Sequence, residues 1–121
     1  MSSPSKRVLV VDDYVDVADM TAEALRVKGM DVATAYTAAT ALDVLSTFRP
    51  EVVLLDIELP EMTGYELARQ ITQSGAACRL VAFTANGDPH LRVRSREAGF
   101  AAHLVKPVAM DLVLLAITGG P

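Results

Sequence analysis

Short apolar runs recur along this chain, and they constrain its fold more than any other feature. Four of them are rich in valine or leucine: VLVV at 8–11, VVLL at 52–55, LVAF at 80–83 and HLV at 103–105. Continuous rather than alternating apolarity is typical of parallel strands that are covered on both faces. A fifth run, DVATAY at 31–36, is more polar, as expected for a strand at the edge of a sheet.

Segments with helical spacing separate these runs. Helices are predicted at 15–28, 38–48, from 63 onward, 90–98 and 110–118. The third of them opens with TGYE, in which Thr63 and Glu66 have the spacing of a capping box. Repeated β-α units with short connections indicate right-handed crossovers and a parallel sheet between helical layers. A doubly wound α/β domain therefore fits the chain, whereas a closed barrel of eight such units needs about 250 residues.

Polar residues close four of the predicted strands. Asp12 and Asp13 follow the run at 8–11, and Asp56 follows the run at 52–55. Thr84 follows the run at 80–83, and Lys106 follows the run at 103–105. In doubly wound sheets the functional site lies outside the carboxyl ends of the strands. We therefore expect these side chains to converge at one edge of the sheet.

The charges of this set indicate its chemistry. Three carboxylates in one place repel one another unless a cation lies between them. Oxygen ligands without histidine or cysteine favour Mg²⁺ over zinc. A carboxylate beside Mg²⁺ can act as a nucleophile toward phosphorus, and Asp56, on a central strand, is the best candidate. Lys106 would then supply positive charge to the phosphoryl oxygens and Thr84 a hydrogen-bond donor.

The motifs VLVVDD, VVLLDIELPEMTGYE, FTAN and HLVKP follow one another along the chain. Over essentially its whole length the chain resembles the receiver domain of two-component response regulators. The resemblance implies a flavodoxin-like (βα)5 fold: a five-stranded parallel sheet in the order 2-1-3-4-5, with helices on both faces. It also implies a signalling domain, not an enzyme, which catalyses only its own aspartyl phosphorylation and dephosphorylation.

The same resemblance assigns roles to the acidic residues. Asp56 would be the phosphoacceptor, charged by the phosphohistidine of a sensor histidine kinase or of a histidine phosphotransfer domain. Mg²⁺ would be the cofactor, bound directly by Asp13 and Asp56, and by Asp12 through water or by direct contact. The backbone carbonyl of Glu58 would be a further metal ligand.

Other residues would carry the response to phosphorylation. Thr84 and Lys106 would hold the phosphoryl oxygens, and the Lys106–Pro107 peptide would be cis. Thr84 would move toward the phosphate and shift the fourth helix and the fifth strand, biasing two states. His103 stands where the family usually has a tyrosine or phenylalanine that swings inward as a switch. The histidine could swing similarly with a pH-sensitive tip, or it could have a fixed hydrogen-bond partner.

Two charged helical surfaces leave partner docking open. Asp16, Asp19 and Glu23 form either a solvated face or a docking surface for a phosphotransfer domain. Arg92 and Arg96 are one turn apart, on a solvated helix or on the surface for an output partner that the sequence does not identify. A weak homodimer would use the segments 90–98, 103–105 and 110–118.

Composition limits the remaining classes of function. With 121 residues, 51% of them hydrophobic, the chain suits one domain over 1–121, with loose ends at 1–5 and 119–121. A net charge of -4 argues against direct binding to nucleic acid or to an anionic membrane. No apolar run approaches the roughly 20 residues of a membrane span. The single Cys78 makes no internal disulfide, so we expect a packing role for it and a cytoplasmic location for the chain.

Two other functions stay open from the sequence. A Mg²⁺-dependent phosphatase of the haloacid dehalogenase type also uses an aspartate nucleophile, but VDDY lacks the second aspartate of its D-x-D motif. A phosphorylation-independent interaction module could keep the fold, although the intact acidic set argues against it. The chain would be a stand-alone regulator or a receiver from a larger protein, such as a hybrid histidine kinase.

Overall fold

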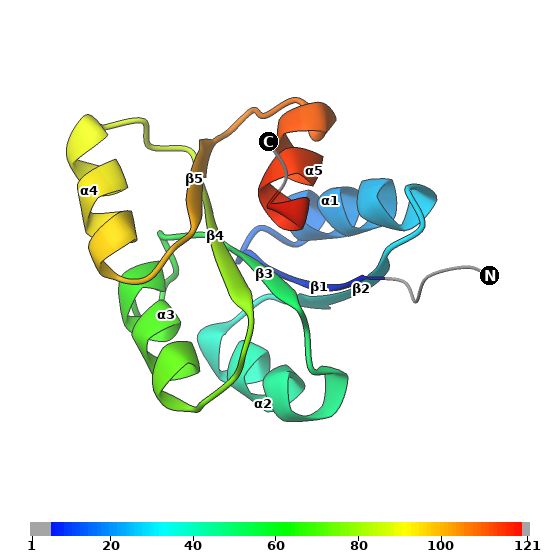
Figure 1. Ribbon diagram of the computed structural model, residues 1–121, viewed down its shortest axis with the longest axis horizontal. Coiled ribbons are helices and arrows are strands. Elements are labelled where there is room, and N and C mark those ends of the chain that lie inside the picture. Colours follow the sequence, from blue (N-terminus) through cyan, green and yellow to red (C-terminus); the bar gives the residue numbers. More distant parts are fainter. Residues whose placement is uncertain (1–5, 120–121) are drawn as a thin grey trace.

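Five strands and five helices alternate along the chain in the computed structural model, which describes residues 6–119 (Figure 1). The strands are β1 (Arg7–Val11), β2 (Asp31–Ala35), β3 (Val52–Leu55), β4 (Arg79–Thr84) and β5 (Ala102–Val105). The helices are α1 (Val15–Val27), α2 (Ala38–Phe48), α3 (Gly64–Gln73), α4 (Pro89–Glu97) and α5 (Met110–Thr118).

All strand pairs are parallel, and the sheet has the order β2-β1-β3-β4-β5. The predicted doubly wound fold, with its strand order, is therefore confirmed. Because the first three strands pair in register, Val11 lies beside Leu55 at the carboxyl ends of β1 and β3. The residues that follow these two strands consequently start from neighbouring positions.

Helices cover both faces of the sheet, with α1 and α5 on one face and α2, α3 and α4 on the other (Figure 1). Alternate residues of one strand enter different cores: Leu9 and Val11 pack in the cluster with α2 and α3, and Val8 and Val10 in the cluster with α1 and α5. Each of these four side chains is buried. Two covered faces thus explain why the strand sequences do not alternate between apolar and polar residues.

The loop after β3 is held against the start of α3 by a close backbone approach. A Cβ atom on Gly64 would lie 2.6 Å from the carbonyl oxygen of Asp56 and 2.6 Å from the Cα of Ile57. Gly64 N–H donates to the Ile57 carbonyl at 2.7 Å, and Thr63 Oγ1 accepts from Glu66 N–H at 3.2 Å, the helix cap that the spacing predicted. Glycine is required here because any side chain would displace the loop that carries Asp56.

The ends predicted to be loose, at 1–5 and 119–121, fall on residues 1–5 and 120–121, which lie outside the described residues, and on Gly119. Gly119 closes α5, with a φ of 68° and its N–H donating to the Leu115 carbonyl at 3.0 Å. Within residues 6–119 no helix has the length and apolar character needed to cross a membrane.

Candidate functional site

Three carboxylates meet at the carboxyl edge of the sheet, as the strand ends predicted. One oxygen from each of Asp12, Asp13 and Asp56 lies within 4.8 Å of the others. Asp12 is 1% exposed and Asp56 is 5% exposed, so two of these charged groups are removed from water. Asp12 and Asp13 follow β1, and Asp56 follows the neighbouring strand β3. Backbone bonds hold these strand ends together, because Asp56 N–H donates to the Val11 carbonyl and Asp12 N–H donates to the Ala35 carbonyl at the end of β2.

Backbone hydrogen bonds fix the orientation of two of these side chains. Asp12 Oδ1 accepts from Tyr14 N–H at 3.0 Å, and Asp56 Oδ1 accepts from Glu58 N–H at 3.1 Å. Asp13 differs, because its Oδ1 is buried and has no hydrogen-bond partner among residues 6–119. A buried carboxylate oxygen without a donor is unfavourable, and a cation would satisfy it.

The ionisation of Asp56 is disfavoured in this setting. Burial raises the pKa of Asp56 from 3.8 to about 6, opposed by the Glu58 N–H and the charge of Lys106. The charges of Asp12 and Asp13 raise this pKa further. A divalent cation beside the three carboxylates would offset both the burial and the repulsion. Their oxygen ligands therefore fit Mg²⁺, the ion that the sequence indicated.

Lys106 supplies the positive charge at this edge. Its Nζ lies 2.5 Å from Asp12 Oδ2 and 3.8 Å from Asp56 Oδ2. The ammonium also lies over the ring of Phe83, 5.2 Å from the ring centroid. The Lys106–Pro107 peptide is cis. The lysine is thus paired first with Asp12, a choice between two aspartates that the strand-end pattern did not predict.

Thr84 ends β4 beside these groups and is fully buried. Its carbonyl accepts from Lys106 N–H at 2.7 Å, which joins the ends of β4 and β5. Its Oγ1 accepts from Asn86 N–H at 3.2 Å. The hydroxyl proton of Thr84 therefore stays available to a ligand oxygen at this edge.

Glu58 and His103 lie outside the group of carboxylates. The Glu58 side chain is exposed, and its backbone N–H, not its carbonyl, is the group with a described bond to Asp56. His103 pairs with Ala82 in the sheet, two residues before Thr84 on β4. Its ring faces α4, where Nδ1 is 2.7 Å from Ser95 Oγ. The structure thus gives His103 the hydrogen-bond partner that was one of its two predicted alternatives.

Sequence reasoning missed three residues that shape this region. Gly64 permits the close approach described above, Phe83 lies beneath Lys106, and Ser95 binds His103. A glycine directly after the capping residue Thr63 was the available signal for the first. Phe83 and Ser95 have no sequence signal of this kind, because their partners come from other elements.

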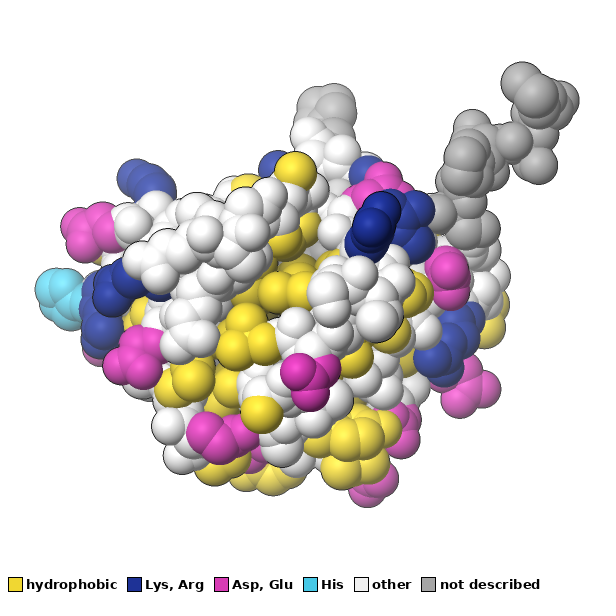
Figure 2. All heavy atoms as spheres, turned by 90° about the horizontal axis from the view of Figure 1, so that it is seen from below, with side chains coloured by type: hydrophobic (Ala, Val, Ile, Leu, Met, Phe, Trp, Pro, Cys, Tyr) yellow, Lys and Arg dark blue, Asp and Glu magenta, His cyan; other side chains and the backbone are white. Residues whose placement is uncertain are grey.

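A cavity of about 580 Å³ lies away from this site, between the end of α2 and the loop before β4. Leu42, Leu45 and Ala76 contribute to its apolar lining, and Arg49 lines it as well. None of the predicted site residues lines it. Figure 2 shows the molecule from below, where basic and acidic side chains are interspersed around apolar ones. The acidic cluster is therefore the better candidate for chemistry.

Residues 8–118 match the family of the response regulator receiver domain. The fold, the acidic cluster and this match define the class of protein: the chain belongs to the receiver domains of two-component signalling.

Particular relatives agree with this assignment. The chain is 33% identical over 110 residues to the response regulator MprA of Mycobacterium bovis, covering 91% of this chain and 48% of MprA. It is 34% identical over 111 residues to the sensor histidine kinase RcsC of Escherichia coli, covering 92% of this chain and 12% of RcsC. The chain therefore spans about half the length of MprA and a small part of RcsC.

Solved structures show the same fold. A CheY-like receiver domain from Methanospirillum hungatei superposes with a TM-score of 0.87 at 30% identity, covering 95% of this chain and 92% of that one. The response regulator TrrA from Thermotoga maritima, solved in complex with Mg²⁺–BeF, superposes with a TM-score of 0.83 at 26% identity. That comparison covers 94% of this chain and 97% of TrrA.

Proposed function

We propose that this chain accepts a phosphoryl group on Asp56 from a phosphohistidine, in a Mg²⁺-dependent reaction, and that the modification switches its binding to partners. The donor would be a sensor histidine kinase or a histidine phosphotransfer domain. One observation carries the proposal: three carboxylate side chains from two strand ends lie within 4.8 Å of one another at their oxygens, with the Lys106 ammonium beside two of them. The Mg²⁺–BeF complex of TrrA supports it.

Asp12, Asp13 and Asp56 would hold the metal ion, with the Glu58 carbonyl as the further ligand. The ion would neutralise the carboxylates and the incoming phosphoryl oxygens. Asp56 is the nucleophile of choice because it follows the central strand β3 and its Oδ2 lies 3.8 Å from Lys106 Nζ, whereas Asp12 Oδ2 is already paired with that ammonium at 2.5 Å. An oxygen of Asp56 forms the new bond to phosphorus as the bond from phosphorus to the donor imidazole nitrogen breaks, and the imidazole leaves with that electron pair.

Lys106 and Thr84 receive the oxygens of the transferred group. The ammonium of Lys106 lies 3.8 Å from Asp56 Oδ2, close enough to move from Asp12 to a phosphoryl oxygen. Thr84 turns its hydroxyl proton to a second oxygen, because its Oγ1 otherwise acts only as an acceptor. This displacement would pass along β4 and β5 to α4, with Thr84 as the switch residue that moves and His103 as the switch residue that transmits the movement to α4 through its contact with Ser95.

The domain would act as one signalling unit over residues 1–121, in the cytoplasm, where its kinase presents the phosphohistidine. It would turn over no substrate apart from its own phosphoryl group. Direct contact with nucleic acid or membrane is not part of this function, because the net charge is -4. A weak homodimer through α4, β5 and α5 remains part of the proposal.

The test is to incubate the protein with MgCl₂ and acetyl phosphate and to record its intact mass. The wild type should gain one phosphoryl group, and Asp56→Asn should gain none. Asp43→Asn is the matched control, because Asp43 is an exposed aspartate of α2 outside the acidic cluster. Absence of a mass gain in the wild type, or an equal gain in Asp56→Asn, would show that the phosphoacceptor is assigned wrongly.

A further inference from the structure

One buried phenylalanine lies outside the apolar core. Among residues 6–119, Phe83 is the only buried hydrophobic residue that belongs to neither of the two apolar clusters on the faces of the sheet. It precedes Thr84 at the end of β4, whereas Val81, two residues earlier on the same face, packs in the cluster with α1 and α5. Large apolar side chains are normally buried by packing against other apolar groups. The burial of Phe83 therefore calls for another partner.

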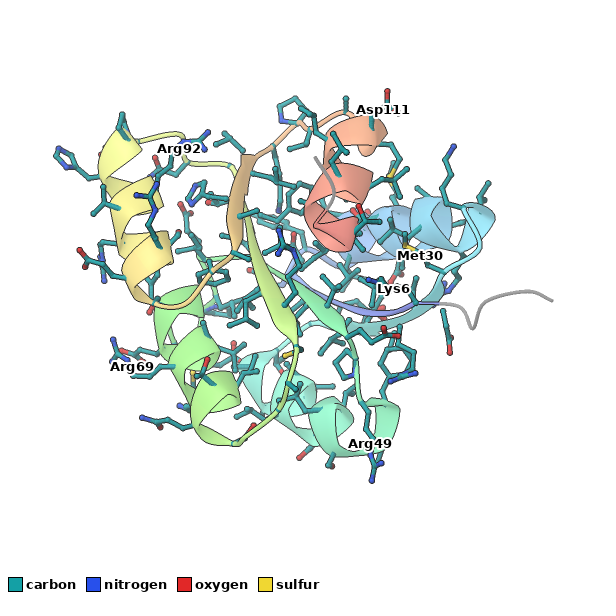
Figure 3. All side chains as sticks on the ribbon, in the orientation of Figure 1. Lys6, Met30, Arg49, Arg69, Arg92 and Asp111 are labelled. Carbon is teal, nitrogen blue, oxygen red and sulfur yellow. The ribbon has the colours of Figure 1, made fainter. Side chains whose placement is uncertain are left out.

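That partner is a cation. Lys106 Nζ lies over the ring of Phe83, 5.2 Å from the ring centroid. An ammonium within about 6 Å of a ring centroid is attracted by the negative potential of the ring face. Figure 3 shows Arg49 and Arg69 extending away from the protein, whereas the side chain of Lys106 is only 18% exposed. Lys106 is thus a cation turned inward onto an aromatic ring, where water competes little for it.

The ammonium has charged neighbours as well as this neutral one. Its Nζ lies 2.5 Å from Asp12 Oδ2 and 3.8 Å from Asp56 Oδ2. To bind a phosphoryl oxygen on Asp56, the ammonium must leave Asp12 and move by about 1 Å, since charge-assisted hydrogen bonds measure about 2.7–2.9 Å. The ring centroid is 5.2 Å away, so a movement of this size keeps the ammonium at or near the limit of about 6 Å for contact with the ring.

The ring becomes most important when the carboxylates hold a divalent ion. Their negative charge is then taken up by the ion, and the ion repels the ammonium of Lys106. Asp12, the present partner of Lys106 at 2.5 Å, consequently holds the lysine less firmly before the phosphoryl group arrives. A long, flexible side chain in this position would turn toward water unless a neutral group attracted its charge. Phe83 is the group that the structure places there.

We propose that Phe83 is a positioning residue for phosphoryl transfer. Its ring would hold the Lys106 ammonium at the acidic edge after Asp12 has turned to the metal ion, so that the ammonium meets the incoming phosphoryl oxygens. A neutral ring suits this task because, unlike a carboxylate, it does not repel the phosphoryl group. The inference rests on the proposed function, in which Lys106 receives an oxygen of the transferred group.

Fluorine on the ring tests this attraction with little change in the shape of the ring. Fluorine withdraws electron density from the ring face, so para-fluorophenylalanine and trifluorophenylalanine in place of Phe83 should weaken the hold on the cation in two steps. The second-order rate constant for labelling by acetyl phosphate in MgCl₂, followed by intact mass, should fall about twofold with one fluorine and about fivefold or more with three. The Kd for Mg²⁺ should not rise, because the carboxylates stay in place.

Two controls separate the cation from general effects of fluorine. In Lys106→Met labelling should be slower, and its remaining rate should be the same for all three rings, because no cation lies over the ring. The same two fluorinated rings placed at Phe100 are the matched control. Phe100 is buried and meets Tyr65 edge-on, with no cation over its ring among residues 6–119. These replacements should leave the labelling rate of the wild type unchanged.

A further measurement does not depend on phosphorylation. In EDTA, urea denaturation should show that trifluorophenylalanine in place of Phe83 raises the equilibrium constant for unfolding about threefold. This increase should vanish in Lys106→Met. It should be smaller than the effect on labelling, because in the metal-free protein Asp12 already holds the ammonium at 2.5 Å.

Several results would overturn the inference. Equal labelling rates for the three rings, the same trend in Lys106→Met, or an equal loss with the rings at Phe100 would show that no attraction to Lys106 is involved. A rise in the Kd for Mg²⁺ parallel to the loss of rate would show that Phe83 only maintains the shape of the site. An unfolding constant that responds to fluorine equally with and without Lys106 would show that the ring does not hold the ammonium.

The failure of this inference is distinct from the failure of the proposed function. A wild type that gains no phosphoryl mass would overturn both. A wild type that is labelled on Asp56, while all three rings at Phe83 react alike, would overturn the role of Phe83 alone.

Discussion

Replacing Asp56 with asparagine should stabilise the metal-free protein at alkaline pH, although Asp56 is the proposed phosphoacceptor. Burial is the largest cause that raises the pKa of this carboxyl from 3.8 to about 6. At about 1.36 kcal/mol per pH unit, keeping the group ionised in the folded state costs about 3 kcal/mol. In the wild type Glu58 N–H lies 3.1 Å from Asp56 Oδ1, and asparagine keeps an oxygen that can accept this bond. The variant loses the attraction between the carboxylate and Lys106. The expected net gain at pH 8 is about 1–3 kcal/mol.

The direction of the pH dependence follows from the sign of the shift. Because the folded pKa of Asp56 lies above the unfolded value, the cost is complete above about pH 7 and declines as the pH falls from about 6 toward 3.8. At pH 5 about half of the cost should remain. Asparagine does not titrate, so the advantage of Asp56→Asn should shrink by about the same factor.

Urea denaturation in EDTA, followed by circular dichroism at pH 8 and pH 5, measures this difference. Asp43→Asn, on the exposed side of α2, controls for the loss of one negative charge and should leave the free energy of unfolding within about 0.5 kcal/mol of the wild type. A destabilised Asp56→Asn at pH 8, or a gain of the same size at both pH values, would refute the argument from burial.

Three further changes probe the same edge of the sheet. Lys106→Met should lower the free energy of unfolding by about 2–4 kcal/mol in EDTA, measured by urea denaturation, because the buried Asp12 loses its ion pair at 2.5 Å; an unchanged midpoint would contradict this. Gly64→Ala should cost about 1–3 kcal/mol and slow acetyl phosphate labelling, since its Cβ would lie 2.6 Å from the Asp56 carbonyl oxygen; labelling at the wild-type rate would show that the loop adapts freely. Mg²⁺ at ten times its Kd should stabilise the wild type by about 1.4 kcal/mol in thermal melts, and Asp13→Asn should remove most of this stabilisation. Equal stabilisation of both proteins by Mg²⁺ would argue against a role for Asp13.

The strand-end pattern predicted that these side chains lie together because their convergence depends on topology alone. Asp12, Asp13, Asp56 and Lys106 each follow a strand, and parallel strands bring their carboxyl ends to one edge whatever the details of packing. The predicted helices and strands agree with the structure to within a residue or two at their ends, since most strands are continuous apolar runs and each helix has a capping residue or a glycine near one of its ends. The region around His103 is different, because the amino-acid sequence left a moving ring and a fixed partner equally open.

The doubly wound fold class and the identity of the acidic residues were therefore determined by the sequence itself, through hydrophobic patterning and the residues that close each strand, and the strand order followed from the resemblance to receiver domains. Only the tertiary structure decided that Lys106 pairs first with Asp12, at 2.5 Å rather than 3.8 Å from Asp56, and that Ser95 binds His103 across the boundary between α4 and β5. The physical reason is one of scale. Periodicity is a property of neighbouring residues, whereas the partner of a buried polar group depends on differences of about an ångström that arise when separate elements pack together.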